Sequence, residues 1–243
     1  MPVSSSGHLE LGKVLLNVEL KEDLTFTVLV HFATVLSTIT VFFRDLKMLT
    51  VGLFEFRWNK PTRYVAKILF SMIPVAIVGI FFRDKVESLF SGNLLLVGIA
   101  LLVTAMLLIS TRLVKAGEKR IPFADAFLMG IAQAVAVIPG ISRSGATIST
   151  GLLLRNNRSE VARFSFLMVL LPVIGAAAMD LMSLASSGES SGIPIWSLIT
   201  GFLAAYLSGF LACRWMIALV KKGNLYWFAL YCALIGTISI IFA

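Results

Sequence analysis

Six long apolar runs constrain the fold of this chain more than any other feature of its sequence. Each run has 18 to 21 residues and at most one charged side chain. A helix needs about 20 apolar residues to cross the hydrocarbon core of a bilayer, whereas barrel strands appear as segments of about 10 residues with alternating hydrophobicity. The sequence therefore predicts an all-α integral membrane protein with six transmembrane helices, at residues 24–43, 65–82, 94–111, 164–184, 193–213 and 225–243.

The overall composition excludes the soluble classes of protein. Apolar residues make up 58% of the chain and charged residues 14%, compared with about 45–50% and about 25% in soluble domains. The two cysteines, Cys213 and Cys232, lie in apolar runs and are too few for a disulfide framework. A soluble globular domain, a disordered chain and a secreted disulfide-rich protein are all excluded.

The basic residues set the expected orientation in the membrane. The net charge is +8, and 16 of the 21 lysines and arginines fall in four clusters, at residues 44–67, 112–120, 155–163 and 214–222. Cytoplasmic loops are enriched in such residues, so we expect these four clusters in the cytoplasm. The loops 83–93 and 185–192 and the C-terminus are then outside. Because the charge is divided among loops, the expected partner is the bilayer and not a nucleic acid.

The segment between the third and fourth long runs does not fit a simple crossing. Both of its ends are expected in the cytoplasm, so it must enter and leave the membrane on the same side. It contains a 16-residue run at 123–138 and a 10-residue run at 145–154, separated by the turn 139–144. A Pro-Gly break, a polar turn and a half-length helix predict a re-entrant helical hairpin, whose tip must line protein or a wet cavity.

The beginning of the chain resembles this hairpin tip. The segment Pro2–His8 is similar to Pro139–Gly145, and each is followed by three predicted membrane helices. Because three is odd, the second unit is inverted relative to the first. We therefore expect one membrane domain over 1–243 made of two inverted-topology repeats, 1–111 and 112–243, with the first arm of the first hairpin preceding residue 1. Such repeats place a substrate site near the midplane; the alternative is a coincidence between two Ser/Gly-rich turns.

Arg143 is the strongest single candidate for a functional residue. A charge at membrane depth is costly unless it is paired or hydrated, and no acid is adjacent to Arg143 in the sequence. The start of the expected short helix favours an anion, and a guanidinium matches phosphate oxygens. With the hydroxyl groups of Ser142, Ser144 and Thr147, Arg143 predicts a phosphate site. The alternative is a helix-capping serine beside an arginine that pairs with a structural carboxylate.

The serines and the histidine near the N-terminus form a second candidate group. Hydroxyl groups and an imidazole can supply a nucleophile and a general acid or base. Ser5 and His8 are therefore candidate catalytic residues, and Ser4 is a candidate phosphate ligand. A serine-rich segment before a helix is more often only a cap or a disordered start, and the functional interpretation depends on the likeness to the second turn.

The chain resembles a known family over essentially its whole length, and three segments carry the most recognisable motifs. Pro139–Thr147 resembles the signature of the bacterial undecaprenyl-diphosphate phosphatases of the bacitracin-resistance type, Pro2–His8 resembles that family's first motif, and Phe164–Pro172 also matches. The resemblance implies hydrolysis of the lipid carrier diphosphate to the monophosphate, which recycles the carrier for cell-wall synthesis. It also implies a bacterial plasma membrane location with the active site open to the outer face.

The resemblance implies a role for several residues. Arg143 would hold a phosphate with Ser142 and Thr147 beside it, His8 would act in proton transfer, and Ser5 matches the functional serine. In this family, a glutamate-bearing segment lies upstream of the motif that Pro2–His8 resembles. That segment is associated with catalysis and with a divalent cation such as Mg²⁺ or Ca²⁺, and it is not part of the printed sequence. We therefore assign no metal ligand in this chain.

Three functional interpretations stay open at this point. The leading one is a membrane phosphatase acting on a polyprenyl diphosphate, with Ser5 or water as the nucleophile. The second is a transporter or flippase for an anionic, phosphate-bearing lipid, because transporters also use inverted repeats and broken helices. The third is an inactive, truncated paralogue that only binds the lipid. His8 beside the serines favours an enzyme, and the sequence is compatible with a homo-oligomer.

Overall fold

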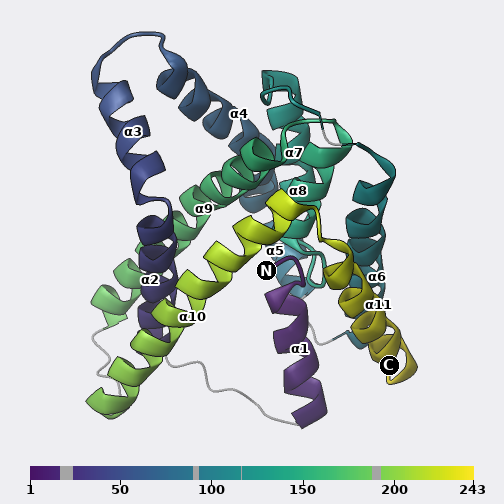
Figure 1. Ribbon diagram of the computed structural model, residues 1–243. Coiled ribbons are helices and arrows are strands. Elements are labelled where there is room, and N and C mark those ends of the chain that lie inside the picture. Colours follow the sequence, from purple (N-terminus) through teal and green to yellow (C-terminus); the bar gives the residue numbers. More distant parts are fainter. Residues whose placement is uncertain (17–23, 90–92, 116, 188–192) are drawn as a thin grey trace. The chain divides into compact units, whose positions relative to one another are not determined.

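The regular elements of the described chain are helices. The computed structural model describes residues 1–243 except 17–23, 90–92, 116 and 188–192 (Figure 1). The helices are α1 (Ser5–Leu16), α2 (Leu24–Val41), α3 (Phe43–Phe54), α4 (Lys60–Phe81), α5 (Arg83–Ser88), α6 (Leu94–Ser110), the 3-10 helix η1 (Thr111–Leu113), α7 (Phe123–Val135), α8 (Arg143–Leu153), α9 (Arg158–Ser187), α10 (Ile195–Lys222) and α11 (Tyr226–Ile241).

The prediction of an all-α membrane protein is confirmed at this level. Among the described residues, four helices are long and apolar enough to cross a membrane, namely α4, α6 continued by η1, α9 and α10. A fifth span results if α2 and α3 are counted together, although they are bent by 78° at Phe42. The apolar helix α11 has only 16 residues. The predicted number of six spans therefore stays a prediction.

The chain divides into two compact units, each of which combines segments from both halves of the sequence. The first compact unit contains Met1–Glu19, Val65–Phe166 and Ile217–Ala243. The second contains Leu20–Tyr64 and Leu167–Met216. Both units therefore draw on both predicted repeats, 1–111 and 112–243, and the repeats stay a prediction.

Helix α6 forms the centre of the first compact unit. It packs along α11, and α8 packs on it as well (Figure 1). Helices α6 and α11 approach closely at Gly98 and Gly236, where a Cβ on either residue would lie 2.9 Å from the carbonyl oxygen of the other. Small residues allow such close contacts between membrane helices.

The predicted break in the second hairpin is confirmed. Helix α7 ends at Val135, the chain turns through Gly140 at φ +94°, and α8 begins at Arg143. The two short helices pack against each other. Proline disfavours the α conformation in the residue before it, and glycine adopts a positive φ without strain, so Pro139-Gly140 explains why the helix stops here.

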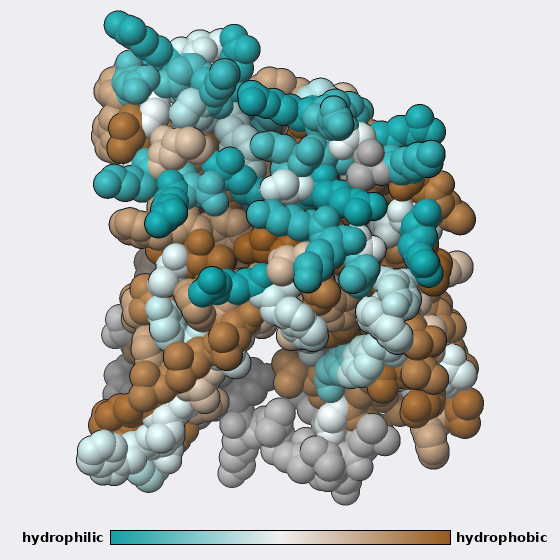
Figure 2. Space-filling model, in the orientation of Figure 1, coloured by the Kyte–Doolittle hydropathy of each residue, from teal (hydrophilic) through white to brown (hydrophobic). Residues whose placement is uncertain are grey.

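In the second compact unit, α10 packs on α2. Gly209 lies against the hydroxyl of Ser37, and the Tyr206 hydroxyl donates a hydrogen bond of 3.2 Å to Thr40 Oγ1. The exposed side chains of α10 include Leu203, Leu207 and Leu211, and brown, hydrophobic atoms run along this helix in Figure 2. Exposed leucines at this spacing are typical of a helix face in contact with lipid.

Candidate active site

The first polar turn, residues 2–8, caps the start of α1. Ser4 has a φ of +58°, and its Oγ accepts a hydrogen bond of 3.3 Å from the Gly7 N–H. The Ser4 and Ser6 hydroxyl oxygens lie 3.4 Å apart. A serine side chain that accepts from the third following N–H is the usual N-cap arrangement, so Ser4 fixes the first turn of the helix.

The second polar turn, residues 139–147, repeats this arrangement. Ser142 Oγ accepts a hydrogen bond of 3.1 Å from the Gly145 N–H, and the Ser142 and Ser144 hydroxyl oxygens lie 3.4 Å apart. The structural equivalence is therefore Ser4 with Ser142, Ser6 with Ser144 and Gly7 with Gly145. In this register, Ser5 and Arg143 occupy the same position, each as the first residue of its helix.

The two polar turns meet within the first compact unit. A Cβ added at Gly7 would lie 3.0 Å from Gly140 Cα and 3.3 Å from Gly140 N. Gly140 is in turn pressed onto α6, where a Cβ would lie 2.7 Å from the Val97 carbonyl oxygen and from Ala100 Cβ. The structure thus brings together two segments that are more than 130 residues apart in the sequence.

Thr104 on α6 holds the second polar turn in place. Its hydroxyl donates toward the carbonyl oxygens of Ala100 and Gly140, at 3.1 and 3.2 Å, and accepts a hydrogen bond of 3.1 Å from the Ser142 N–H. Thr104 is fully buried. Nothing in the sequence marks this residue, because one threonine in an apolar run resembles any other.

His8 is oriented by contacts on both sides of its ring. Nδ1 lies 2.8 Å from the Ser4 carbonyl oxygen, and Nε2 lies 2.8 Å from the Tyr231 hydroxyl of α11. A carbonyl only accepts, so Nδ1 carries the proton, and in the neutral imidazole Nε2 accepts from Tyr231. The two rings are nearly parallel, with centroids 5.4 Å apart. Tyr231 is therefore a site residue that the sequence analysis missed.

Arg143 and Ser5 have exposed side chains at the starts of their helices. Within the described part of the chain, the Arg143 guanidinium forms no hydrogen bond or ion pair. The alternative in which it pairs with a structural carboxylate therefore finds no support there. An exposed guanidinium at a helix N-terminus can bind an anion through its own donors and through the positive end of the helix dipole.

The Thr147 side chain is directed into the packing between α8 and α9. It is fully buried, and its hydroxyl lies 2.6 Å from the Ser165 hydroxyl of α9 and donates to the Arg143 carbonyl oxygen at 2.9 Å. Ser142 is also buried, whereas Ser144 is partly exposed. The arrangement gives Thr147 a role in supporting α8 behind Arg143.

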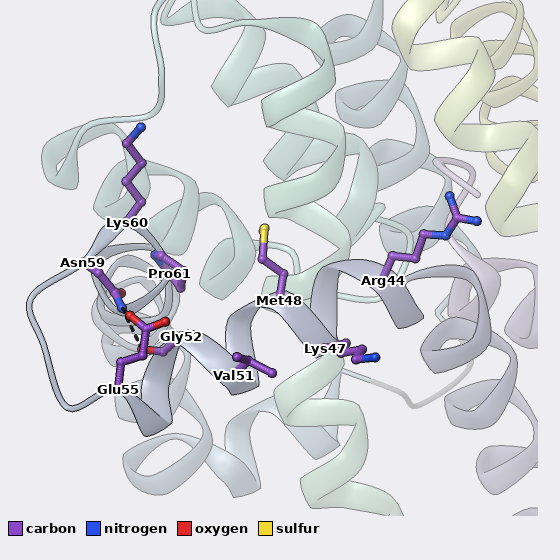
Figure 3. Close-up of a pocket in the computed structure, with 9 residues that line it drawn as sticks. All are labelled: Arg44, Lys47, Met48, Val51, Gly52, Glu55, Asn59, Lys60 and Pro61. Carbon is purple, nitrogen blue, oxygen red and sulfur yellow. Dashed lines mark hydrogen bonds between the residues drawn. The ribbon is translucent and has the colours of Figure 1, made fainter.

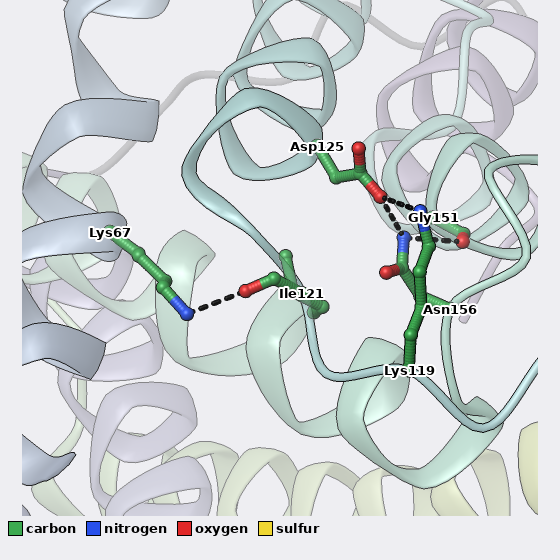
Figure 4. A network of polar contacts seen from close by, with 6 residues as sticks. All are labelled: Lys67, Lys119, Ile121, Asp125, Gly151 and Asn156. Carbon is green, nitrogen blue, oxygen red and sulfur yellow. Dashed lines mark hydrogen bonds and ion pairs between the residues drawn. The ribbon is translucent and has the colours of Figure 1, made fainter.

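A polar network closes the base of the α7–α8 hairpin (Figure 4). Asp125 Oδ2 lies 2.8 Å from Lys119 Nζ and accepts a hydrogen bond of 2.8 Å from Asn156 Nδ2, which also donates to the Gly151 carbonyl oxygen at 3.1 Å. Nearby, Lys67 Nζ on α4 donates to the Ile121 carbonyl oxygen at 2.6 Å. These contacts join the start of α7 to the end of α8, and so fix the helix that carries Arg143.

Comparison with known proteins decides the family. A sequence profile described as bacitracin resistance protein BacA matches residues 1–238. The chain belongs to the BacA family. Its relatives in this family include undecaprenyl-diphosphatases from Bacteroides fragilis, 51% identical over 99% of this chain and 91% of the relative, and from Christiangramia forsetii, 51% identical over 100% and 92%. A more distant undecaprenyl-diphosphatase, from Methanosphaera stadtmanae, is 36% identical over 99% and 91%.

The described residues of this BacA-family chain do not assemble a metal site. No three histidine, cysteine, aspartate or glutamate side chains lie together among them as ligands would. Of the two buried acids among the described residues, Glu10 and Asp125, Asp125 is paired with Lys119.

A cavity in the second compact unit contains none of the predicted site residues (Figure 3). Its volume is about 620 Å³, and Arg44, Lys47 and Lys60 line it together with Glu55 and Asn59. Asn59 Nδ2 donates to Glu55 Oε2 and to the Gly52 carbonyl oxygen, both at 2.8 Å. This cavity is therefore separate from the two polar turns that form the candidate active site in this BacA-family chain.

Proposed function

We propose that this chain is a membrane phosphatase that hydrolyses undecaprenyl diphosphate to undecaprenyl phosphate and phosphate, and so recycles the lipid carrier for cell-wall synthesis. Family membership and the named activity of relatives at 51% identity support hydrolysis over transport. The structural observation that carries the proposal is the contact between the two polar turns at Gly7 and Gly140. It brings an arginine-bearing helix start and an oriented histidine into one compact unit.

Arg143 would bind the terminal phosphate of the substrate. Its guanidinium can form two parallel hydrogen bonds to phosphate oxygens, and the N-terminal turn of α8 adds the positive end of a helix dipole. The charge on these oxygens changes as the bridging P–O bond breaks. Donors fixed in advance by Thr104 and the hairpin base stabilise that charge without reorganisation.

His8 would move the proton that hydrolysis requires. The nucleophile, either water or the Ser5 hydroxyl, attacks the terminal phosphorus, and the bridging oxygen leaves with undecaprenyl phosphate. If Ser5 attacks, a water molecule then cleaves the phosphoserine ester, which releases phosphate and restores the hydroxyl. The lone pair on His8 Nε2 accepts the nucleophile's proton, either directly or through the Tyr231 hydroxyl. The Ser4 carbonyl oxygen accepts from Nδ1 at 2.8 Å and keeps the ring in the orientation this step needs.

The membrane arrangement is part of the same proposal. Two inverted-topology repeats with six spans would put the polar turns at the interface between repeats, and the matching hydrogen bonds of the two turns support this symmetry. The distribution of basic loops supports a plasma membrane protein with the active site open to the outer face. A lipid diphosphate could then reach the site without leaving the bilayer.

The test is phosphate release from undecaprenyl diphosphate by purified Arg143→Ala and Arg143→Lys variants. We expect Arg143→Ala to lose at least about a hundredfold in rate, and Arg143→Lys to recover little, because an ammonium does not reproduce a planar fork. Arg120→Ala, which removes an exposed arginine of the same unit, is the matched control. Near-normal turnover of Arg143→Ala with an unchanged thermal midpoint would refute the site.

A further inference from the structure

A second, smaller cavity lies at the other end of α8 from Arg143. Its volume is about 160 Å³. Four parts of the first compact unit line it, through Thr111 and Arg112 after α6, Leu152 on α8, Arg158 on α9, and Gly223 and Leu225 between α10 and α11. Leu152 follows Arg143 by nine residues on one helix, which corresponds to about 14 Å at 1.5 Å per residue. The cavity is therefore separate from the proposed catalytic site.

Two arginines share this cavity without an acidic partner. None of its lining residues is acidic, and neither guanidinium forms an ion pair within the part of the chain that the structure describes. Arg112 is held over the ring of Tyr226, with its Cζ 4.8 Å from the ring centroid. Arg158 lies against Gly223, where a Cβ would come within 2.5 Å of Nη1. Glycine at φ +75° thus leaves the space that the Arg158 side chain occupies.

An anion is the ligand that this arrangement fits. Two cations that line one partly open cavity repel each other unless a negative charge lies between them. Arg158 is also the first residue of α9, so the positive end of that helix adds to the field. Guanidinium groups match phosphate oxygens in geometry, and the cavity has room for a phosphate group with several water molecules.

We propose that Arg112 and Arg158 form a second anion site, which binds the phosphate of an anionic phospholipid headgroup. Free phosphate shares this chemistry, but the surroundings favour a lipid. Leu113, next to Arg112, is 86% exposed, and Trp227, next to Tyr226, is 58% exposed. Exposed apolar and aromatic side chains beside cations are typical of the boundary between headgroups and acyl chains. Such a site would anchor the end of α8 and the α10–α11 turn to the membrane surface.

The experiment measures lipid binding in an Arg143→Ala background, so that its result does not depend on catalysis or on anion binding at the polar turns. Purified protein in neutral detergent is titrated with dioleoyl phosphatidylglycerol, with dioleoyl phosphatidylcholine and with inorganic phosphate, and the thermal midpoint is followed. The variants are Arg112→Gln and Arg158→Gln, and Arg120→Gln is the control that removes one exposed charge of the same unit. Arg158→Lys keeps the charge and replaces Arg158→Gln if the latter does not fold.

We expect phosphatidylglycerol, and not phosphatidylcholine, to raise the midpoint of the parent protein. Loss of either arginine should weaken this binding about tenfold or more, because each supplies a hydrogen bond to a charged group. The affinity of Arg158→Lys for phosphatidylglycerol should lie between those of the parent and Arg158→Gln. Arg120→Gln should bind this lipid as tightly as the parent does. Equal affinity of all variants would overturn the site. Displacement of phosphatidylglycerol by inorganic phosphate at comparable concentration would overturn the assignment to a lipid.

Discussion

Replacement of Gly7 by alanine tests whether the contact between the two polar turns is needed for activity. The added Cβ would lie 3.0 Å from Gly140 Cα and 3.3 Å from Gly140 N. Carbon atoms prefer separations of about 3.5–4.0 Å, so the turns must move apart by about 0.5–1 Å. Gly140 cannot yield, because it is already pressed onto α6 at Val97 and Ala100. The substitution therefore moves His8 relative to the second turn.

The expected effect on the rate follows from this displacement. A catalytic group that is about 1 Å out of place can lose about a hundredfold in rate, so we expect the kcat of Gly7→Ala for undecaprenyl diphosphate to fall by about 10- to 100-fold. The protein should still insert and purify, because the substitution changes one contact of one short helix. The assay is phosphate release in detergent, at matched amounts of folded protein.

Gly12→Ala is the matched control for this prediction. Gly12 lies on the same helix, α1, but a Cβ there would meet nothing within 4 Å. Alanine is favoured over glycine in a helix by up to about 1 kcal/mol, so this variant should be as stable as the parent or slightly more stable, with unchanged kcat. An equal loss of rate in both variants, or a Gly7→Ala variant as active as the parent, would refute the reasoning.

Three further predictions concern single contacts and the topology. Tyr231→Phe removes only the hydroxyl that forms the 2.8 Å hydrogen bond with His8 Nε2. Such a bond contributes about 0.5–1.5 kcal/mol, so kcat should fall about 2- to 10-fold. An unchanged kcat would show that Tyr231 is not part of the site. Thr104→Val keeps the shape of the side chain but leaves the Ser142 N–H without its acceptor. The free energy of unfolding should therefore fall by about 1–3 kcal/mol. A thermal midpoint equal to that of the parent would contradict this prediction. In a cysteine-free background, an impermeant thiol reagent on intact cells should label a cysteine at Ser186 and spare one at Lys115, both exposed positions; the reverse pattern would invert the proposed orientation.

The sequence by itself determined the class of protein and the break in the second hairpin. Both properties are local. A run of about 20 apolar residues predicts a membrane helix regardless of its neighbours, and the run 94–111 corresponds closely to α6 at Leu94–Ser110. The Pro139-Gly140 pair limits its own backbone, so the end of α7 could also be predicted. The cationic helix start at Arg143 was visible for the same reason.

Hydropathy did not determine where a helix bends. The apolar run 24–43 predicted one span and corresponds to α2 at Leu24–Val41, but it did not predict that the chain bends by 78° at the end of this run and continues as α3 to Phe54. Neither proline nor glycine marks the bend at Phe42, whose side chain is buried. A bend of this kind depends on which surfaces the two helices pack against, and an average of apolarity over residues does not contain that information.

Only the tertiary structure decided how the site is assembled. His8 and Tyr231 are 223 residues apart, and Thr104 is 36 and 38 residues from the two groups of the second turn that it contacts. Gly7 and Gly140 each looked like an ordinary turn glycine, yet Gly7 is required because the Gly140 backbone approaches it, and Gly140 because it is pressed onto Val97 and Ala100 of α6. Contacts between distant residues leave no periodic or spacing pattern in the chain, since they depend on the packing of α1 and α8 against α6. The sequence therefore specified the two polar turns and their chemistry, and the packing of the helices around α6 determined that the two turns meet.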